Sequence, residues 1–258
     1  MSKLIFVTGA SSGIGQALAW RYYRAGFSLA LVARRTEEMH AWATRQQLDQ
    51  GRYQIYGADV AVVDSIVAAA NLCLQCQGVP DVVIANAGVS IGMDTAIRDD
   101  LDVLARTFAI NNTGLAATFH AFITPMAQRG SGALVGIGSV AGIRGLPGHG
   151  AYCASKAGVI SYCESLRGEL LPSGVQVITI CPGYIDTPLT QKNRYAMPFL
   201  MQPADFADRA FDAIRAGATY RVIPWQMGWV AKGLRLLPNW LFDKVFSGRP
   251  RKRRSSEV

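Results

Sequence analysis

Several features that define whole classes of protein are scarce in this chain of 258 residues. Only 17% of the residues are charged, and the five cysteines are too few for a disulfide scaffold. No run of uncharged apolar residues reaches the length of about 18 that a membrane-spanning helix needs. A strand-like run begins immediately after the first residues, so we expect no secretory signal peptide.

The residues that are abundant point to a folded α/β protein. Half of the chain is apolar, which excludes a disordered protein, and the 26 glycines follow no triplet period, which excludes collagen. The net charge of +8 is mostly local, because five basic residues lie within six positions near the C-terminus. These residues are Arg249, Arg251, Lys252, Arg253 and Arg254. No aromatic stacking platform accompanies them, so we expect no nucleic-acid partner.

Short apolar segments rich in Val and Ile alternate with longer stretches typical of helices. The apolar segments are Leu4–Thr8, Ser28–Ala33, Tyr53–Tyr56, Asp81–Ala85, Ala133–Gly138, Val175–Cys181 and Tyr220–Ile223. The helical stretches cover about 13–25, 36–50, 62–77, 98–129, 152–171 and 203–217. Glycines at 26, 51, 78, 130, 174 and 217 stand where these helices are expected to end. The apolar segments show no polar alternation, which indicates strands buried on both faces of a parallel sheet.

This order predicts an α/β fold with a doubly wound, Rossmann-like parallel sheet. We expect a single NAD(P)-binding domain over residues 1–223 and an apolar, basic helical extension over 224–248. The basic tail over 249–258 is expected to be disordered.

A glycine-rich turn follows the first strand, in Thr8–Gly15. Gly9 permits a tight turn, Gly13 lets backbone approach a pyrophosphate, and Gly15 allows close packing of helix on strand. The helix that follows presents free N–H groups to phosphates. The alternative is a glycine-rich turn with no ligand. The predicted cofactor-binding residues of this turn are Gly9, Ser11, Ser12, Gly13, Ile14 and Gly15.

Arginines follow the second strand, where NAD-binding proteins usually carry an acidic residue. Arg34 and Arg35 suit a 2′-phosphate, which predicts a preference for NADP(H) over NAD(H). The alternative is a pair of solvated arginines at the start of a helix. Two further strand ends face the same crevice. Asp59 is placed to bond an adenine amino group, and Asn86–Gly88 supplies small residues beside a flat ring.

A tyrosine and a lysine four residues apart open a predicted helix. Tyr152 and Lys156 share one face, and a cation beside a phenol lowers the pKa of that phenol from about 10. A lowered pKa suits general acid–base work. Ser139 ends the fifth strand and is placed to hold a substrate carbonyl oxygen. The pair by itself is common on helix surfaces. Its coincidence with Ser139 and the nucleotide turn at one sheet edge favours a catalytic site.

These residues resemble the motifs of the short-chain dehydrogenase/reductase family, in order and at family spacing over about residues 3–223. The matching segments are Thr8–Gly15, Asp59-Val60, Ala85–Gly88, Asn111–Gly114, Gly138–Gly142, Tyr152–Lys156 and Pro182-Gly183 with Thr187. The resemblance implies an enzyme that moves hydride between NAD(P) and a carbonyl or alcohol. One departure is Ala85, where the family often has asparagine; we expect a lost hydrogen bond without lost activity.

The resemblance also assigns roles. It implies that Tyr152 is the acid–base, that Lys156 lowers the pKa of this tyrosine and holds the nicotinamide ribose, and that Ser139 positions the carbonyl. Asn111 is implied to anchor a water that relays protons to Lys156. Residues implied to contact the cofactor include Val60, Asn86, Ala87, Gly88, Pro182, Gly183, Ile185 and Thr187. Family likeness further suggests a homodimer or homotetramer built through helices near 102–129 and 152–171.

The leading hypothesis is an NADPH-dependent carbonyl reductase, or the reverse alcohol dehydrogenase, for an apolar substrate. Residues 188–202 follow the sixth strand, where a lid over substrate would lie, and they include Tyr195, Met197, Phe199, Leu200 and Met201. The alternative is a surface helix packed on the core. A non-catalytic NADP(H)-binding sensor and a membrane-surface scaffold are the other functions considered. A protein that only senses the nucleotide does not need the serine, tyrosine, lysine and asparagine together, and this sequence has all four.

The extension over 225–246 combines Trp, Leu and Phe with Lys232, Arg235 and Lys244, and the basic cluster follows it. This pattern fits a helix lying on an anionic membrane through residues 225–254, or a helix pair packed on the domain or on a partner subunit. The predicted location is therefore the cytoplasm, with the protein either free or peripheral on the inner membrane surface. Cys73 and Cys76 form a CxxC within a predicted helix, and we expect no metal site.

Overall fold

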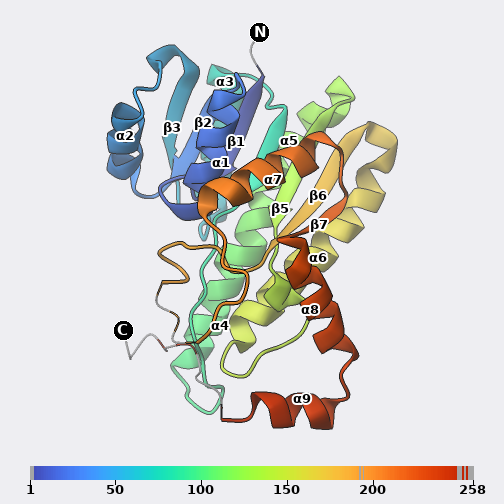
Figure 1. Cartoon of the computed structure of the whole chain (residues 1–258). Helices are drawn as coiled ribbons and strands as arrows, with labels where there is room; N and C mark the ends of the chain where they lie inside the picture. Colours follow the sequence, from blue (N-terminus) through green and yellow to red (C-terminus); the bar gives the residue numbers. More distant parts are fainter. Residues whose placement is uncertain (1–2, 192, 194, 249–251, 253, 255–258) are drawn as a thin grey trace.

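The computed structural model describes residues 3–191, 193, 195–248, 252 and 254. In this part of the chain, seven parallel strands form one sheet in the order β3-β2-β1-β4-β5-β6-β7 (Figure 1). The strands are β1 (Leu4–Thr8), β2 (Ser28–Ala33), β3 (Tyr53–Gly57), β4 (Val82–Ala85), β5 (Gly132–Ile137), β6 (Val175–Pro182) and β7 (Tyr220–Ile223). The chain winds outward from β1 to β3 and then returns to place β4 on the other side of β1. This reversal creates a crevice at the carboxyl ends of β1 and β4.

Helices cover both faces of the sheet. One face carries α1 (Gly13–Arg24), α2 (Thr36–Arg45) and α7 (Pro203–Arg215), and the other carries α3 (Val63–Cys76), α5 (Gly114–Arg129) and α6 (Gly150–Leu170). Side chains of β1 alternate between the two layers: Ile5 and Val7 enter one core, while Leu4 and Phe6 enter the other. The predicted doubly wound α/β fold is confirmed, because both faces of the sheet are buried.

Two predicted helices differ from the structure. The helix expected over 36–50 ends at Arg45, because Gln47 takes a left-handed φ of 52° and turns the chain. That turn lets Leu48 reach the core, where it is 7% exposed, and Gly51 falls in a separate short turn rather than at a helix end. The stretch over 98–129 is divided into α4 (Asp100–Phe108), a π-helical turn (Ala109–Thr113) and α5.

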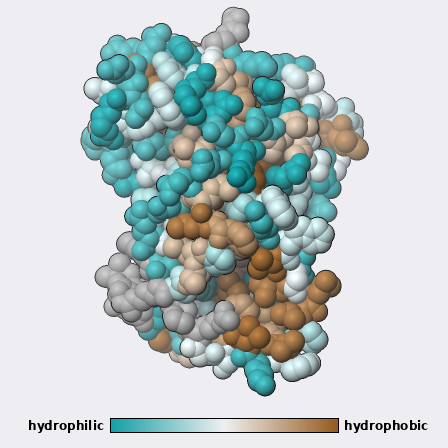
Figure 2. Space-filling view, in the orientation of Figure 1, coloured by the Kyte–Doolittle hydropathy of each residue, from teal (hydrophilic) through white to brown (hydrophobic). Residues whose placement is uncertain are grey.

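Two helices form the extension after β7: α8 (Trp225–Leu236) and α9 (Asn239–Phe246). The guanidinium of Arg144 binds the corner between them. It donates to the carbonyl oxygens of Leu234 and, at 2.7 Å, of Leu237, and at 3.1 Å to Oδ1 of Asn239. It also lies 4.0 Å from the ring centroid of Phe242. Figure 2 shows hydrophobic side chains gathered at the lower right, over these helices.

The described residues of the basic tail contact the body of the protein. Nε of Arg254 lies 2.6 Å from Oδ2 of Asp100, a carboxylate that is 3% exposed, and this hydrogen bond lowers the pKa of Asp100. Nζ of Lys252 lies 3.4 Å from the Leu189 carbonyl oxygen. Residues 249–251, 253 and 255–258 lie outside the described residues, so the expected disorder of the tail stays a prediction. None of the described helices has the length and hydropathy of a membrane span.

Replacing Arg144 with alanine should release the extension, because the last carbonyl groups of α8 lose their hydrogen-bond donor. We expect the free energy of unfolding to fall by about 1–3 kcal/mol. Limited proteolysis should cut faster within 225–246. Arg98→Ala, which removes an exposed i,i+4 ion pair, is the matched control and should change neither quantity appreciably. Unchanged proteolysis of the Arg144 variant would contradict the role assigned to this arginine.

Candidate active site

A cleft of about 1040 Å³ runs along the carboxyl ends of the strands. One end is lined by the glycine-rich turn and by Arg34, Arg35 and Asp59. The other end is lined by Ser139 and Tyr152. The predicted residues on its surface are Gly9, Ser11, Ser12, Gly13, Ile14, Arg34, Asp59, Val60, Asn86, Ala87, Gly88, Ser139, Tyr152, Lys156, Pro182, Gly183, Ile185 and Thr187. Gly15 and Asn111 are absent from this lining and lie behind it.

The glycine-rich turn fits a dinucleotide phosphate group. Gly9 and Gly13 have φ values of 69° and 56°, which favour glycine. A Cβ on Gly15 would lie 2.3 Å from the Gly9 carbonyl oxygen, so this glycine permits the helix to pack against the turn. Ser12 precedes α1 without a capping side-chain hydrogen bond, which leaves the first N–H groups of the helix for an anion.

The two arginines after β2 have different partners. Nη1 of Arg34 lies 3.6 Å from Oδ2 of Asp59. Arg35 donates to Oγ of Ser11 at 3.0 Å and also pairs with Glu38 at 2.8 Å. Arg35 is therefore the arginine that contacts the glycine-rich turn. Both guanidinium groups are more than half exposed at the mouth of the cleft, where they can reach an added anion.

Asn86 holds the crevice together rather than presenting its amide to the cleft. Its Nδ2 donates to the Thr8 carbonyl oxygen at 2.9 Å, and Oγ1 of Thr8 accepts from the backbone N–H groups of Asn86 and Ala87, each at 3.1 Å. Oδ1 of Asp59 likewise accepts from Ala61 N at 3.0 Å. The backbone of 86–88 lines the cleft, and the predicted adenine contact of Asp59 stays a prediction.

Asn111 lies in the π-helical turn and is 1% exposed. Its Oδ1 accepts from Val89 N at 2.9 Å, and its Nδ2 donates to the Val89 carbonyl oxygen at 3.0 Å and to Oγ of Ser155 at 2.9 Å. A Cβ on Gly88 would lie 3.2 Å from Oδ1 of Asn111 and 3.5 Å from Nζ of Lys156, so these two side chains flank Gly88. The geometry makes Asn111 a positioning residue, and its water relay stays a prediction.

Tyr152 and Lys156 lie on the first two turns of α6, and Ser139 lies two residues after the end of β5, where it caps a short 3-10 turn. Nζ of Lys156 donates to the Ile137 carbonyl oxygen at 2.7 Å and lies 5.9 Å from the centroid of the Tyr152 ring. The three residues therefore meet at one end of the cleft, as their sequence positions predict.

The pKa values at this end differ from the expectation. Burial raises the pKa of the Tyr152 phenol to about 12, while its hydrogen bond with Ser139 acts to lower it. Burial lowers the pKa of Lys156 to about 8. The expected net lowering of the Tyr152 pKa is not seen in this structure, because burial dominates and Nζ of Lys156 is directed to the Ile137 carbonyl. The roles of the two residues in catalysis stay predictions.

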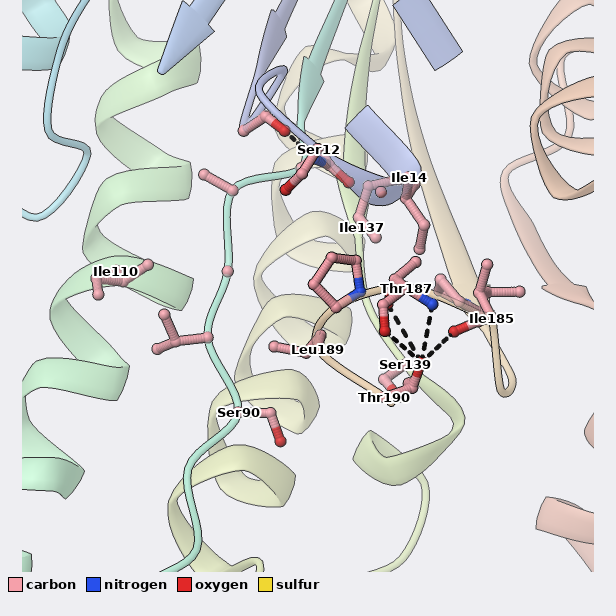
Figure 3. Close-up of a pocket in the computed structure, with 18 of the residues that line it drawn as sticks. Ser12, Ile14, Ser90, Ile110, Ile137, Ser139, Ile185, Thr187, Leu189 and Thr190 are labelled. Carbon is pink, nitrogen blue, oxygen red and sulfur yellow. Dashed lines mark hydrogen bonds between the residues drawn. The ribbon is translucent and has the colours of Figure 1, made fainter. Parts of the chain in front are cut away.

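The loop after β6 closes the middle of the cleft. Figure 3 shows Ile185, Thr187, Leu189 and Thr190 around one turn. The Thr190 hydroxyl donates to the Ile185 carbonyl oxygen, and its Oγ1 accepts from Thr187 N at 3.0 Å. The sequence analysis did not select Thr190. A threonine three residues after Thr187 carries no signal until the turn is seen.

Aromatic groups gather near Tyr152. Nε2 of His149 lies 3.2 Å from Oη of Tyr195, and the rings of Tyr184 and Tyr195 are 6.2 Å apart. Burial lowers the pKa of His149 and raises that of Tyr195. The described residues of 188–202 include no regular helix, which disfavours the surface-helix alternative. Lining residues that the sequence analysis missed include Ser90, Ile91 and Lys252. Ser90 and Ile91 closely follow the predicted segment Asn86–Gly88, whereas Lys252 comes from the C-terminal tail, distant in sequence.

Comparisons with known proteins agree with this geometry. The short chain dehydrogenase family model matches residues 3–197. An uncharacterized oxidoreductase of Myxococcus xanthus is 37% identical and covers 93% of this chain and 95% of its own. A sulfoacetaldehyde reductase of Chromohalobacter salexigens is 36% identical, over 74% of this chain and 75% of its own. A short-chain dehydrogenase from Sphingobium yanoikuyae, solved with NADPH, is 28% identical with a TM-score of 0.78, over 96% and 98% of the chains.

The chain belongs to the short-chain dehydrogenase/reductase family. It is an oxidoreductase that uses a nicotinamide cofactor.

The lowered pKa of Lys156 predicts a pH-dependent contribution to stability. Between about pH 8 and its unfolded value of 10.5, this site binds fewer protons in the folded chain than in the unfolded chain. Its contribution to the free energy of unfolding therefore rises with pH. Relative to Lys156→Met, the wild type should gain about 1–2 kcal/mol from about pH 7.5 to about pH 9.5 in chemical denaturation. A difference that stays constant across this range would contradict the buried ammonium.

Proposed function

We propose that this protein is an NADP(H)-dependent reductase of a carbonyl compound, or the reverse alcohol dehydrogenase, with Tyr152 as its acid–base. One observation carries the proposal. Ser139, Tyr152 and Lys156 meet at one end of a continuous cleft, and the glycine-rich turn with two arginines lines its other end. A non-catalytic nucleotide sensor has no use for the first three groups.

Each residue at the Ser139–Tyr152 end of the cleft has a separate role in the proposed reaction. Tyr152, with its pKa near 12, is protonated at neutral pH and donates to a developing alkoxide. Ser139 stabilises the same oxygen by a hydrogen bond, as an oxyanion-hole donor does. Lys156 is held by Ile137 beside Gly88, where it is placed to bind a ribose hydroxyl. The bound cofactor supplies or accepts the hydride.

The cofactor preference rests on charge at the opposite end. Arg34 and Arg35 follow β2, and Arg35 reaches Ser11 on the glycine-rich turn. Guanidinium groups bind phosphate with paired hydrogen bonds, so the two arginines favour a 2′-phosphate over a bare ribose hydroxyl. The NADPH complex of the Sphingobium relative supports this preference.

The substrate preference rests on the aromatic group beside Tyr152. Tyr184 and Tyr195 pack together, and Tyr195 reaches His149. Tyr195 belongs to the segment expected to form a lid, and Ile91 and Leu189 line the cleft nearby. These side chains favour an apolar group next to the carbonyl.

Tyr152→Phe should lower kcat by about 10²–10⁴, because it removes the proton donor while keeping the ring. The dissociation constant for NADPH should stay nearly unchanged. Activity is measured as NADPH oxidation with a panel of aldehydes and ketones. Tyr162→Phe is the matched control, since Tyr162 lies on the same helix with 37% of its surface exposed. Full turnover in the Tyr152 variant would refute the assignment.

Arg34→Ala combined with Arg35→Ala should raise the dissociation constant for NADPH by about 10- to 100-fold, because two charge-assisted hydrogen-bond donors are lost. Binding of NADH should change little. Isothermal titration with both cofactors measures the difference. Arg45→Ala, an exposed arginine at the end of α2, is the control. Equal losses for NADPH and NADH would contradict the proposed phosphate contact.

A further inference from the structure

The outer face of α8 is apolar where a water-facing helix is normally polar. Trp225, Trp229 and Leu236 are 62%, 67% and 83% exposed. Their spacing of four and seven residues places them on one face of the helix. The opposite face packs inward through Met227 and Ala231, each 5% exposed. The inner face of α8 therefore already packs on the core, and the large side chains form a separate stripe that faces outward.

The stripe continues onto α9. Trp240 is 70% exposed and Val245 is 39% exposed. The resulting surface is named the α8–α9 face: Trp225, Trp229, Leu236, Trp240 and Val245. Figure 2 shows hydrophobic side chains in brown at the lower right, over the two helices that carry this face. Large exposed apolar side chains gathered on two consecutive helices are typical of an interaction site.

Basic groups accompany the apolar ones. Lys232, Arg235 and Lys244 are exposed on the same two helices, against one exposed acidic residue, Asp243. Nζ of Lys232 lies 5.3 Å from the ring centroid of Trp229. The sequence then adds Arg249, Arg251 and Arg253 after α9, while Lys252 and Arg254 contact the body of the protein. A surface of tryptophan and leucine bordered by positive charge complements a bilayer with anionic headgroups.

We propose that the α8–α9 face docks on the surface of an anionic lipid bilayer. Tryptophan suits the boundary between headgroups and acyl chains, because its ring is apolar and its N–H is polar. The lysines and the arginine contact lipid phosphates at the same depth. The helices lie on the bilayer and do not cross it.

A second copy of the chain fits this face less well. In a two-fold dimer the same surface meets itself. The basic side chains of one copy would then face a surface that is itself basic, with only Asp243 to compensate. Like charges opposed across an interface weaken it. An anionic bilayer has no such conflict.

The face is rigidly joined to the active site. Arg144 binds the corner between α8 and α9, and it lies in the segment that connects Ser139 to Tyr152. A Cβ on Gly183, which lines the cleft, would lie 2.8 Å from Cγ of Met227 on α8. Docking therefore places the cleft beside the bilayer, where apolar compounds dissolve.

Vesicle co-sedimentation of the full-length protein tests the proposal. The probes are vesicles of phosphatidylcholine alone and of phosphatidylcholine with phosphatidylglycerol in equal amounts. We expect sedimentation with the anionic vesicles and much less with the neutral ones. Combining Trp225→Ser, Trp229→Ser and Leu236→Ser should lower the partition coefficient by about tenfold or more. Leu171→Ser is the matched control: this leucine is 78% exposed and lies before β6, at the amino end of the strands, whereas α8 follows the carboxyl end of β7.

A second variant, Lys232→Glu with Lys244→Glu, keeps the apolar stripe and should weaken only the binding to anionic vesicles. Wild-type protein that stays in the supernatant with anionic vesicles overturns the proposal, as does a serine variant that binds like wild type. Light scattering reports the alternative. A wild-type oligomer that the serine variant dissociates, without vesicle binding, assigns the face to a second copy and overturns the lipid proposal. None of these measurements depends on turnover.

Discussion

The hydroxyl of Thr8 at the end of β1 holds the glycine-rich turn against the loop after β4, and the geometry of the cleft depends on this contact. It accepts from two successive backbone N–H groups, those of Asn86 and Ala87, and it is 1% exposed. Asn86 returns a hydrogen bond to the Thr8 carbonyl oxygen. These hydrogen bonds fix the position of the turn after β1 relative to the loop after β4. This is the point where the strand order reverses, and ligands of such sheets bind there.

From this contact a chain of hydrogen bonds leads to the chemical groups. Val89, which follows the same loop, is bound on both its backbone polar atoms by Asn111. Asn111 in turn donates to Ser155 on α6, and the next residue, Lys156, donates to Ile137 at the end of β5. Helix α6 is therefore positioned relative to the glycine-rich turn by buried polar contacts rather than by apolar packing alone. Such contacts set a direction as well as a distance.

The relation between Tyr152 and Lys156 shows where sequence-based argument stops. Spacing of four residues correctly places both on one face of α6. It does not say which atom the flexible lysine side chain reaches. In the structure Nζ of Lys156 donates to the Ile137 carbonyl oxygen, on a strand remote in sequence. Burial raises the pKa of Tyr152 and lowers the pKa of Lys156. The end of α2 is similar, because Leu48 reaches a core that the local pattern does not reveal.

Local pattern and spacing were sufficient for the alternation of strands and helices, the glycine-rich turn, and the grouping of Ser139, Tyr152 and Lys156. Each depends on residues close in sequence or on the rule that parallel strands end at one edge. Tertiary structure alone decided that Arg35 rather than Arg34 contacts the glycine-rich turn, and that Lys252 returns to the cleft. It also decided that α8 turns Met227 and Ala231 inward and its tryptophans outward. Those outcomes depend on which segments, distant in sequence, pack against one another in the fold. The order of apolar and polar residues along the chain does not specify that packing.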